Sequence, residues 1–171
     1  DVAGTLNNLG NVLRNLGERA AARAAYEEAL GIYRHLAEAH PAAYKPNVAT
    51  TLNNLGNVLR NLGERAAARA AYEEALGIRR RLAEAHPAAY EPDVAGTLNN
   101  LGNVLDNLGE RAAARAAYEE ALGIYRKYVE KWPQAFMENF LIVLRNYIKV
   151  APRAPDDRWW QLWEELQKQS K

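Results

Sequence analysis

Apolar residues recur every three or four positions at the start of the chain, with steps of four, three, four and three between them. This spacing keeps them on one face of an α-helix. The residues of the stripe are Val2, Leu6, Leu9, Leu13 and Leu16. Asp1 is a candidate N-cap, and Gly17 is a candidate C′ residue with a positive φ angle. The pattern predicts a first helix that begins after Asp1 and ends at Gly17.

A second helix is predicted over about residues 18–39, because this segment is rich in alanine, the strongest helix former. Gly31 lies inside it at a cost in helix propensity, and we attribute this glycine to a close contact with a neighbouring helix. The pair His40 and Pro41 ends the second helix. The residues up to Pro46 are predicted to form a loop, since proline disfavours helix in the residue before it.

The segment 6–13 recurs at 52–59 and again at 98–105, so the chain repeats with a period of 46 residues. A fixed period of this size indicates stacked supersecondary units, none of which can bury its apolar face alone. Asn47 and Asp93 stand where Asp1 does and are the next N-cap candidates. We therefore expect one all-α solenoid domain with repeats at 1–46, 47–92 and 93–138, followed by a partial repeat and cap at 139–171.

Each unit carries a large residue, a Leu–Gly pair, a second large residue, a glycine and an alanine four residues before a tyrosine. In the first unit these are Leu6, Leu9, Gly10, Leu13, Gly17, Ala22 and Tyr26, followed by Ala29 and Leu30. This pattern resembles the tetratricopeptide repeat, in a long-helix variant similar to kinesin light chain repeats. The closing proline of that family is replaced by Arg34, Arg80 and Arg126. The resemblance implies a right-handed superhelix whose first helices line a concave, peptide-binding surface.

The C-terminal segment is predicted to close the array. One further period aligns Phe140 with Val94, so residues 140–150 read as a shortened first helix of a fourth unit. Asp156 is a candidate N-cap for a final helix. Three residues of that helix share a face and would cover the last repeat: Trp159, Trp163 and Leu166. The alternative is that Trp160 or Trp163 anchors a partner, because exposed tryptophan is favoured at interfaces.

Polar residues occupy the face of each first helix opposite its apolar stripe. Asparagine there costs about 0.5 kcal/mol or more against alanine in a helix interior, so a function should offset it. An amide group both donates and accepts hydrogen bonds and can hold a peptide backbone of any sequence. The predicted peptide-binding residues are Asn7, Asn11, Arg14, Asn15, Asn53, Asn57, Arg60, Asn61, Asn99, Asn103, Asp106 and Asn107. The structural alternative, hydrogen bonding between repeats, applies best to Asn8, Asn54 and Asn100 on the flank.

Charge adds detail to this surface. Arg14 and Arg60 are positive, whereas Asp106 is negative at the matching position of the third unit. One end of the groove would therefore suit a carboxylate and the other a base, with ordinary surface charge as the alternative. The run from Arg79 to Arg81 is interpreted as solvent-exposed surface.

Composition excludes several classes of function. Lys and Arg number 22 and Asp and Glu 21, and this balance lacks the basic field that nucleic acid or an anionic membrane would require. Cysteine is absent, and Ser170 is the only serine. The histidines lack metal-ligand spacing, and His40 and His86 read as repeated turn residues. We expect no enzymatic activity, no cofactor, no metal, no nucleic-acid partner and no membrane span.

The first residues, Asp1 to Gly4, lack the basic-then-apolar pattern of a signal peptide, and the compartment is unknown, with the cytoplasm as the expectation. The chain lacks a starting methionine, so we expect a fragment or a processed product. The leading functional hypothesis is a scaffold that binds a peptide or a helix of a partner protein. One alternative is an engineered or idealised array with no natural ligand. Another is self-association through the open N-terminal repeat face or the tryptophan-rich C-terminal helix.

Overall fold

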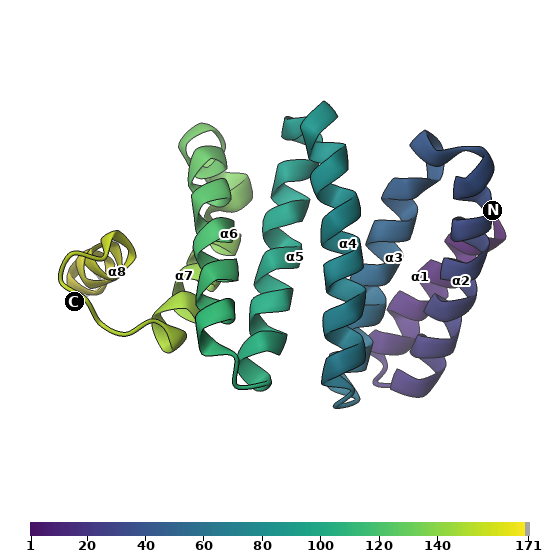
Figure 1. Ribbon diagram of the computed structural model, residues 1–171, viewed down its shortest axis with the longest axis horizontal. Coiled ribbons are helices and arrows are strands. Elements are labelled where there is room, and N and C mark those ends of the chain that lie inside the picture. Colours follow the sequence, from purple (N-terminus) through teal and green to yellow (C-terminus); the bar gives the residue numbers. More distant parts are fainter. Residues whose placement is uncertain (170–171) are drawn as a thin grey trace.

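The computed structural model describes residues 1–169, and this part of the chain consists of eight α-helices without a strand. The helices are α1 (Val2–Asn15), α2 (Arg19–Ala39), α3 (Pro41–Asn61), α4 (Arg65–Ala85), α5 (Pro87–Asn107), α6 (Arg111–Lys131), α7 (Pro133–Val150) and α8 (Arg158–Gln169). Each helix up to α7 packs against the next in sequence, and α1, α3, α5 and α7 also contact one another along the stack. Figure 1 shows the helical pairs side by side in chain order, which confirms the all-α solenoid.

Short turns join the two helices of each unit, as the sequence predicts. The three turn glycines have positive φ angles of 82°, 82° and 80°: Gly17, Gly63 and Gly109. In the first turn the backbone N–H of Glu18 donates to the carbonyl of Leu13 at 2.9 Å, which closes the end of α1. Glycine is required at these positions because side chains disfavour the left-handed region.

The connection between units differs from the predicted loop. The first helices of the second and third units, α3 and α5, begin at Pro41 and Pro87. The N-cap assignments of Asn47 and Asp93 are therefore wrong. Proline suits the first helical position because its missing N–H needs no partner there. Pro46 then lies inside α3, where it withholds a donor only from a carbonyl in the exposed first turn.

A tyrosine of each second helix packs directly on a glycine of each first helix. A Cβ atom added at Gly10, Gly56 or Gly102 would lie 2.7, 2.6 or 2.5 Å from the ring of Tyr26, Tyr72 or Tyr118, respectively. These three rings are buried. The two helices of a unit can therefore approach this closely only because no side chain stands at the glycine.

The second-helix glycines do not have the role predicted for Gly31. A Cβ atom added at Gly31, Gly77 or Gly123 would meet nothing within 4 Å. The prediction of a close helix contact at Gly31 is wrong because this residue lies on the exposed side of α2. Close approach is instead the property of the first-helix glycines.

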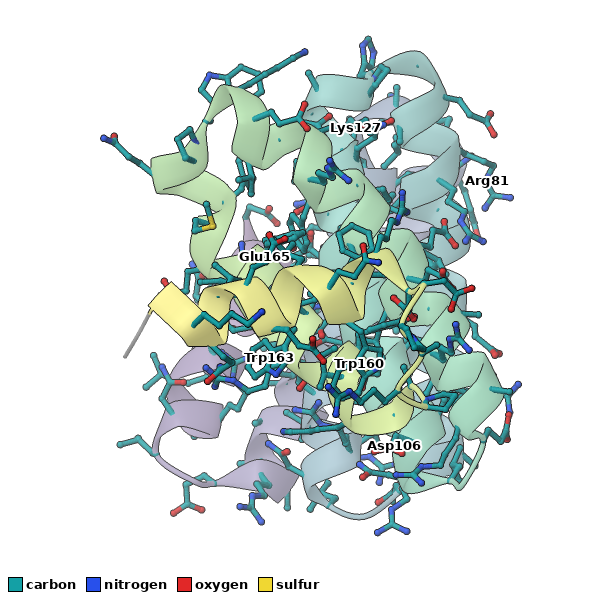
Figure 2. All side chains as sticks on the ribbon, turned by 90° about the vertical axis from the view of Figure 1, so that its left-hand side faces the viewer. Arg81, Asp106, Lys127, Trp160, Trp163 and Glu165 are labelled. Atoms are coloured by element: carbon teal, nitrogen blue, oxygen red, sulfur yellow. The ribbon has the colours of Figure 1, made fainter. Side chains whose placement is uncertain are left out.

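The C-terminal cap forms as predicted in outline. Phe140, Leu144 and Tyr147 are buried on α7, although that helix begins at Pro133 rather than at residue 140. Figure 2 shows α8 crossing the end of the array, with Trp160 and Trp163 on one side of the helix and Glu165 on the other. The buried Trp159 ring meets that of Phe140 edge to face at 5.9 Å between centroids.

The residue that caps α8 is Asp157, and the prediction of Asp156 is wrong. Asp157 Oδ1 accepts hydrogen bonds from the backbone N–H groups of Trp159 at 2.9 Å and Trp160 at 3.3 Å. Its Oδ2 accepts the hydroxyl hydrogen of Tyr147 at 2.5 Å and lies 3.6 Å from Arg115. These partners hold Asp157 in place, whereas the side chain of Asp156 is exposed.

The Asp157 carboxyl has a perturbed pKa. Burial opposes its ionisation, but the hydrogen bonds from Tyr147, Trp159 and Trp160 outweigh burial and hold the pKa below its ordinary value. A group with a lowered folded pKa stabilises the fold above its unfolded pKa, which is about 3.9 for aspartate. That stabilisation is lost as the pH falls through the folded value.

The two classes of glycine predict opposite effects of the same substitution. Gly56→Ala should lower the free energy of unfolding by about 1–3 kcal/mol, because the new methyl group overlaps the Tyr72 ring. Gly77→Ala should raise it by about 0.5–1 kcal/mol, because alanine costs less entropy in a helix and meets no neighbour. Urea unfolding followed by circular dichroism measures both, and equal effects would contradict the assigned contact.

The cap predicts a dependence on acid pH. Asp157→Asn keeps a good N-cap residue but removes the charge. Between about pH 5 and pH 2 the unsubstituted chain should therefore lose more free energy of unfolding than this variant. Urea titrations followed by tryptophan fluorescence at each pH measure the difference. Asp156→Asn is the matched control, and its free energy of unfolding should depend on pH as that of the unsubstituted chain does. Parallel curves for the Asp157 variant and the unsubstituted chain would exclude this role for the cap.

Candidate functional site

Three hollows lie along the first helices and collect most of the predicted peptide-binding residues. The largest, of about 410 Å³, is lined by Asn53 and Asn99, and the smallest, of about 150 Å³, by Asn7. The third, of about 350 Å³, is lined by five of the predicted residues: Arg60, Asn61, Asn103, Asp106 and Asn107. We call the twelve predicted residues together the asparagine surface. Asn11, Arg14, Asn15 and Asn57 belong to it but line none of these hollows.

One asparagine of each first helix is bound to the packed tyrosine of its own unit. The tyrosine hydroxyl donates to the side-chain oxygen of Asn11, Asn57 and Asn103 at 2.8, 2.8 and 2.7 Å. Burial raises the pKa of the Tyr72 hydroxyl to about 12, so this donor stays protonated at neutral pH. These asparagines therefore have a structural role that the sequence analysis did not identify.

A second asparagine of each first helix accepts a hydrogen bond from the following unit. Asn53 Oδ1 accepts from Asn100 Nδ2 at 3.2 Å, and Asn99 Oδ1 accepts from Asn146 Nδ2 at 3.0 Å. In the first unit Asn7 Oδ1 accepts instead from the Thr51 hydroxyl at 3.3 Å. The structure confirms the inter-repeat role for Asn100. Asn146 was missed, although it stands one period after Asn100.

These contacts change the chemistry of the asparagine surface. In each of these amides the oxygen already accepts a bond within the protein, whereas residues 1–169 provide no acceptor for the Nδ2 groups of Asn11, Asn57 and Asn103. The amides remain able to donate. A row of N–H donors suits carbonyl or carboxylate oxygens of a ligand, rather than donors and acceptors alike.

The charges on the surface are distributed less simply than the sequence implies. Asp106 lies 3.7 Å from Arg111 in an ion pair and lines the same hollow as Arg60 and Lys149. The negative charge at this end is therefore partly offset by three neighbouring cations. This hollow offers both cations and amides to a ligand.

The interpretation of Arg79 as exposed surface is wrong. Its side chain is 8% exposed and occupies the position that Tyr33 and Tyr125 have in the other units. Nη1 donates to the Thr97 hydroxyl at 2.5 Å and to the Asp93 carbonyl at 3.2 Å. Burial lowers the pKa of this guanidinium, and the Asp93 carboxylate opposes the shift. The tyrosines one period away were the signal that this position points inward.

The neighbouring residues of that run do lie on the surface. Arg80 Nη2 forms an ion pair with Glu120 at 2.7 Å, and Arg81 is exposed at the edge of the view in Figure 2.

The C-terminal tryptophans Trp160 and Trp163 are not fully exposed, because both are half-buried against the core. A role for either of them in binding a partner stays a prediction.

Residues 1–169 contain no group of three His, Cys, Asp or Glu side chains placed to hold a metal ion. In the same range, no helix is both long and apolar enough to cross a membrane.

Comparison with solved structures supports the architecture. The crystal structure of BtubC (BKLC) from P. vanneervenii is similar, with a TM-score of 0.71 and 24% sequence identity. The match covers 98% of this chain and 62% of that chain, so this chain spans less than two thirds of its length. At this identity the likeness shows the fold. No protein with a curated description matches the chain.

The repeats in the sequence match a known protein family. The tetratricopeptide repeat model matches residues 1–81 and, overlapping with them, residues 47–127. These matches cover the helical pairs from α1 to α5 and most of α6. The chain belongs to the tetratricopeptide repeat family.

Proposed function

We propose that this protein is a non-enzymatic scaffold whose asparagine surface binds a peptide segment or a helix of a partner protein. Tetratricopeptide repeats generally mediate protein–protein interaction and are typically non-catalytic. The observation that carries the proposal is the row of amide donors, repeated every 46 residues along the first helices. A peptide backbone offers a matching row of carbonyl acceptors whatever its side chains are.

The charged groups narrow the ligand chemistry. Arg60, Asn61 and Lys149 line the same hollow and can all donate to an oxygen anion. A segment with an acidic side chain near this hollow therefore fits better than a neutral one. This is the proposed role of the Arg60 end of the groove.

The alternative of an idealised array without a natural ligand has its own support. The first two units differ at only five of 46 positions, and consensus repeats are unusually designable. The hydrogen bonds of Asn57 and Asn53 also account for part of the asparagine content without any ligand. A direct search for a ligand distinguishes the two proposals.

The choice of variants follows from the internal contacts. Alanine has a higher helix propensity than asparagine, but Asn57→Ala would leave the buried Tyr72 hydroxyl without its acceptor. In such a variant, a loss of binding could not be separated from a loss of stability. Arg60 and the exposed Asn61 are better targets, because residues 1–169 provide no partner for either side chain.

The test is a random peptide-library selection against the full chain, followed by titration of an enriched peptide. Arg60→Ala combined with Asn61→Ala should weaken binding about tenfold or more through the loss of a charged donor and an amide donor. Arg81→Ala, on a second helix, is the matched control and should bind as the unsubstituted chain does. Failure to enrich any sequence, or unchanged binding by the double variant, would favour an array without a ligand in this groove.

A further inference from the structure

The largest hollow, which is lined by residues of α3 to α7, contains a buried arginine where the other units have a tyrosine. Arg79 is 8% exposed and lines this hollow of about 410 Å³, whereas Tyr33 and Tyr125 are the equivalent residues. A buried charge lowers the stability of a protein unless partners compensate it, and a tyrosine avoids that loss. We therefore ask which groups engage the guanidinium of Arg79.

Arg79 uses one nitrogen for the fold and leaves the rest of its guanidinium group free. Both of its hydrogen bonds, to the Thr97 hydroxyl and to the Asp93 carbonyl, come from Nη1. Within residues 1–169 neither Nε nor Nη2 has an acceptor, and neither is among the unpartnered polar atoms that the protein seals from solvent. Nε–H and Nη2–H lie on one edge of the planar group, and two parallel donors of this kind match the two oxygens of a carboxylate. The free edge of Arg79 is thus a bidentate carboxylate site in the hollow.

A free carboxylate lines the same hollow. Asp93 is exposed, and within the described chain its carboxylate has neither a hydrogen bond nor an ion pair. Asp93 offers Arg79 its main-chain carbonyl instead, so the two opposite charges share the hollow without pairing directly. The residues one period earlier are the neutral Asn47 and Tyr33, so this hollow gains a cation and an anion together. A ligand that carries both charges can engage both groups.

The part of the hollow that belongs to α6 and α7 is apolar. The rings of Tyr125 and Phe136 lie 6.4 Å apart between centroids, and Ile142, which lines the same hollow, is 41% exposed. An apolar group of a ligand that covers Ile142 removes this surface from water. The volume of the hollow, about 410 Å³, falls within the range of roughly 300–1,000 Å³ that is typical of sites for small molecules.

We propose that this hollow binds a free α-amino acid with an apolar side chain. The carboxylate of the ligand lies on the Nε and Nη2 edge of Arg79, its ammonium group faces Asp93, and its side chain covers Ile142. A lone carboxylate fits less well because Asp93 repels it, and a lone cation fits less well because Arg79 repels it. The ligand is a small molecule, so the proposal stands whether or not the asparagine surface binds a peptide.

The equivalent hollow one unit earlier provides a reference within the same chain. It has a volume of about 150 Å³ and is lined by Tyr33 and Asn47 where the larger hollow has Arg79 and Asp93. None of the residues that line it carries a charge. The fold therefore accommodates the uncharged pair at this place, and the same pair can be introduced into the larger hollow.

The probe for the test is L-leucine, titrated into the full chain labelled with ¹⁵N and followed by NMR chemical shifts, including that of Arg79 Nε–H. Saturable binding with a Kd of about 1 mM or lower is expected. Leucinamide lacks the carboxylate and 4-methylpentanoate lacks the ammonium group, and each should bind about tenfold more weakly or worse. Absence of shifts with leucine, or equal binding of either analogue, overturns the proposal. These titrations need no substitution, so they decide the proposal even where a variant fails to fold.

Substitutions in the hollow separate its two charges. Arg79→Lys keeps the positive charge but lacks the pair of parallel donors, so it should weaken leucine binding about tenfold or more. Asp93→Asn should weaken leucine binding but leave or improve the binding of 4-methylpentanoate, because the repelling carboxylate is gone. Unchanged affinity of either variant for leucine contradicts the role given to that residue and overturns the proposal.

The control for folding takes its residues from the chain itself. Arg79→Tyr with Asp93→Asn gives the larger hollow the pair that Tyr33 and Asn47 form one period earlier. This double variant should keep the circular dichroism of the unsubstituted chain and lose leucine binding. Arg81→Ala, on the exposed side of the same helix, should bind leucine as the unsubstituted chain does. A folded double variant with unchanged affinity would place leucine elsewhere and overturn the proposal.

A blocked acidic peptide distinguishes a free amino acid from the acidic side chain of a bound partner. An acetylated and amidated glycine–glutamate–glycine peptide offers a carboxylate without an ammonium group. It should bind more weakly than leucine does. If it binds more tightly and shifts the Arg79 Nε–H signal, the occupant is an acidic side chain, and the proposal is overturned.

The result is separable from that of the proposed peptide binding, although Asn53 and Asn99 of the asparagine surface also line this hollow. Arg60 and Asn61 line a different hollow, so Arg60→Ala with Asn61→Ala should leave leucine binding unchanged. Loss of leucine binding by that variant, with its circular dichroism unchanged, would place leucine in the other hollow and overturn the proposal. A library selection that enriches no peptide leaves the leucine titration as it is, so each proposal is judged by its own measurement.

Discussion

The contact between a tyrosine ring and the bare backbone of a glycine sets the distance between the two helices of each repeat. Tyr72 lies so close to α3 that even a methyl group at Gly56 would overlap its ring, and its hydroxyl reaches Asn57 one residue further on. Because the ring is buried, the hydroxyl needs an acceptor, and an asparagine on the neighbouring helix provides it. Shape and hydrogen bonding therefore fix the same pair of helices in the same geometry. Three copies of this contact give three nearly identical units. Identical units can stack with the same rotation and translation from each unit to the next.

The polar face of the first helices follows from this constraint and from the stacking. An asparagine in a helix interior is unfavourable, but a buried hydroxyl without an acceptor costs more, about 1–3 kcal/mol. Asn57 resolves that conflict within a unit, and Asn53 accepts a separate amide–amide hydrogen bond from Asn100 of the next unit. In both bonds the oxygen of the α3 asparagine is the acceptor and its amino group stays unused. The surface that remains is one of donors, and this polarity is a by-product of how the repeat is held together.

Periodicity predicted the helices, the turn glycines and the terminal cap, because these depend on local spacing and on a repeat that the sequence states three times. The predictions from sequence were wrong where contacts between helices determine which of several locally allowed conformations or roles a residue adopts. Pro46 is compatible with a helix because it affects only the exposed first turn of α3. Gly31 meets no neighbour, whereas Gly56 does, and spacing alone does not show which face a glycine occupies. Arg79 is buried because the equivalent position in the other units holds a buried tyrosine. Asp157, and not Asp156, caps α8 because its carboxylate also accepts a hydrogen bond from Tyr147.

The ion pairs between units have a consequence for how such a chain can change its length. Arg34 binds Glu74 between the first two units as Arg80 binds Glu120 between the second and third, so the two joints are interchangeable parts. Removal of the middle unit would bring α2 against α5 and α6 through side chains that already match. The array can thus be shortened or lengthened by whole units without new surfaces having to evolve. Gene duplication and loss, rather than point substitution, then become the easiest route to an array of different length.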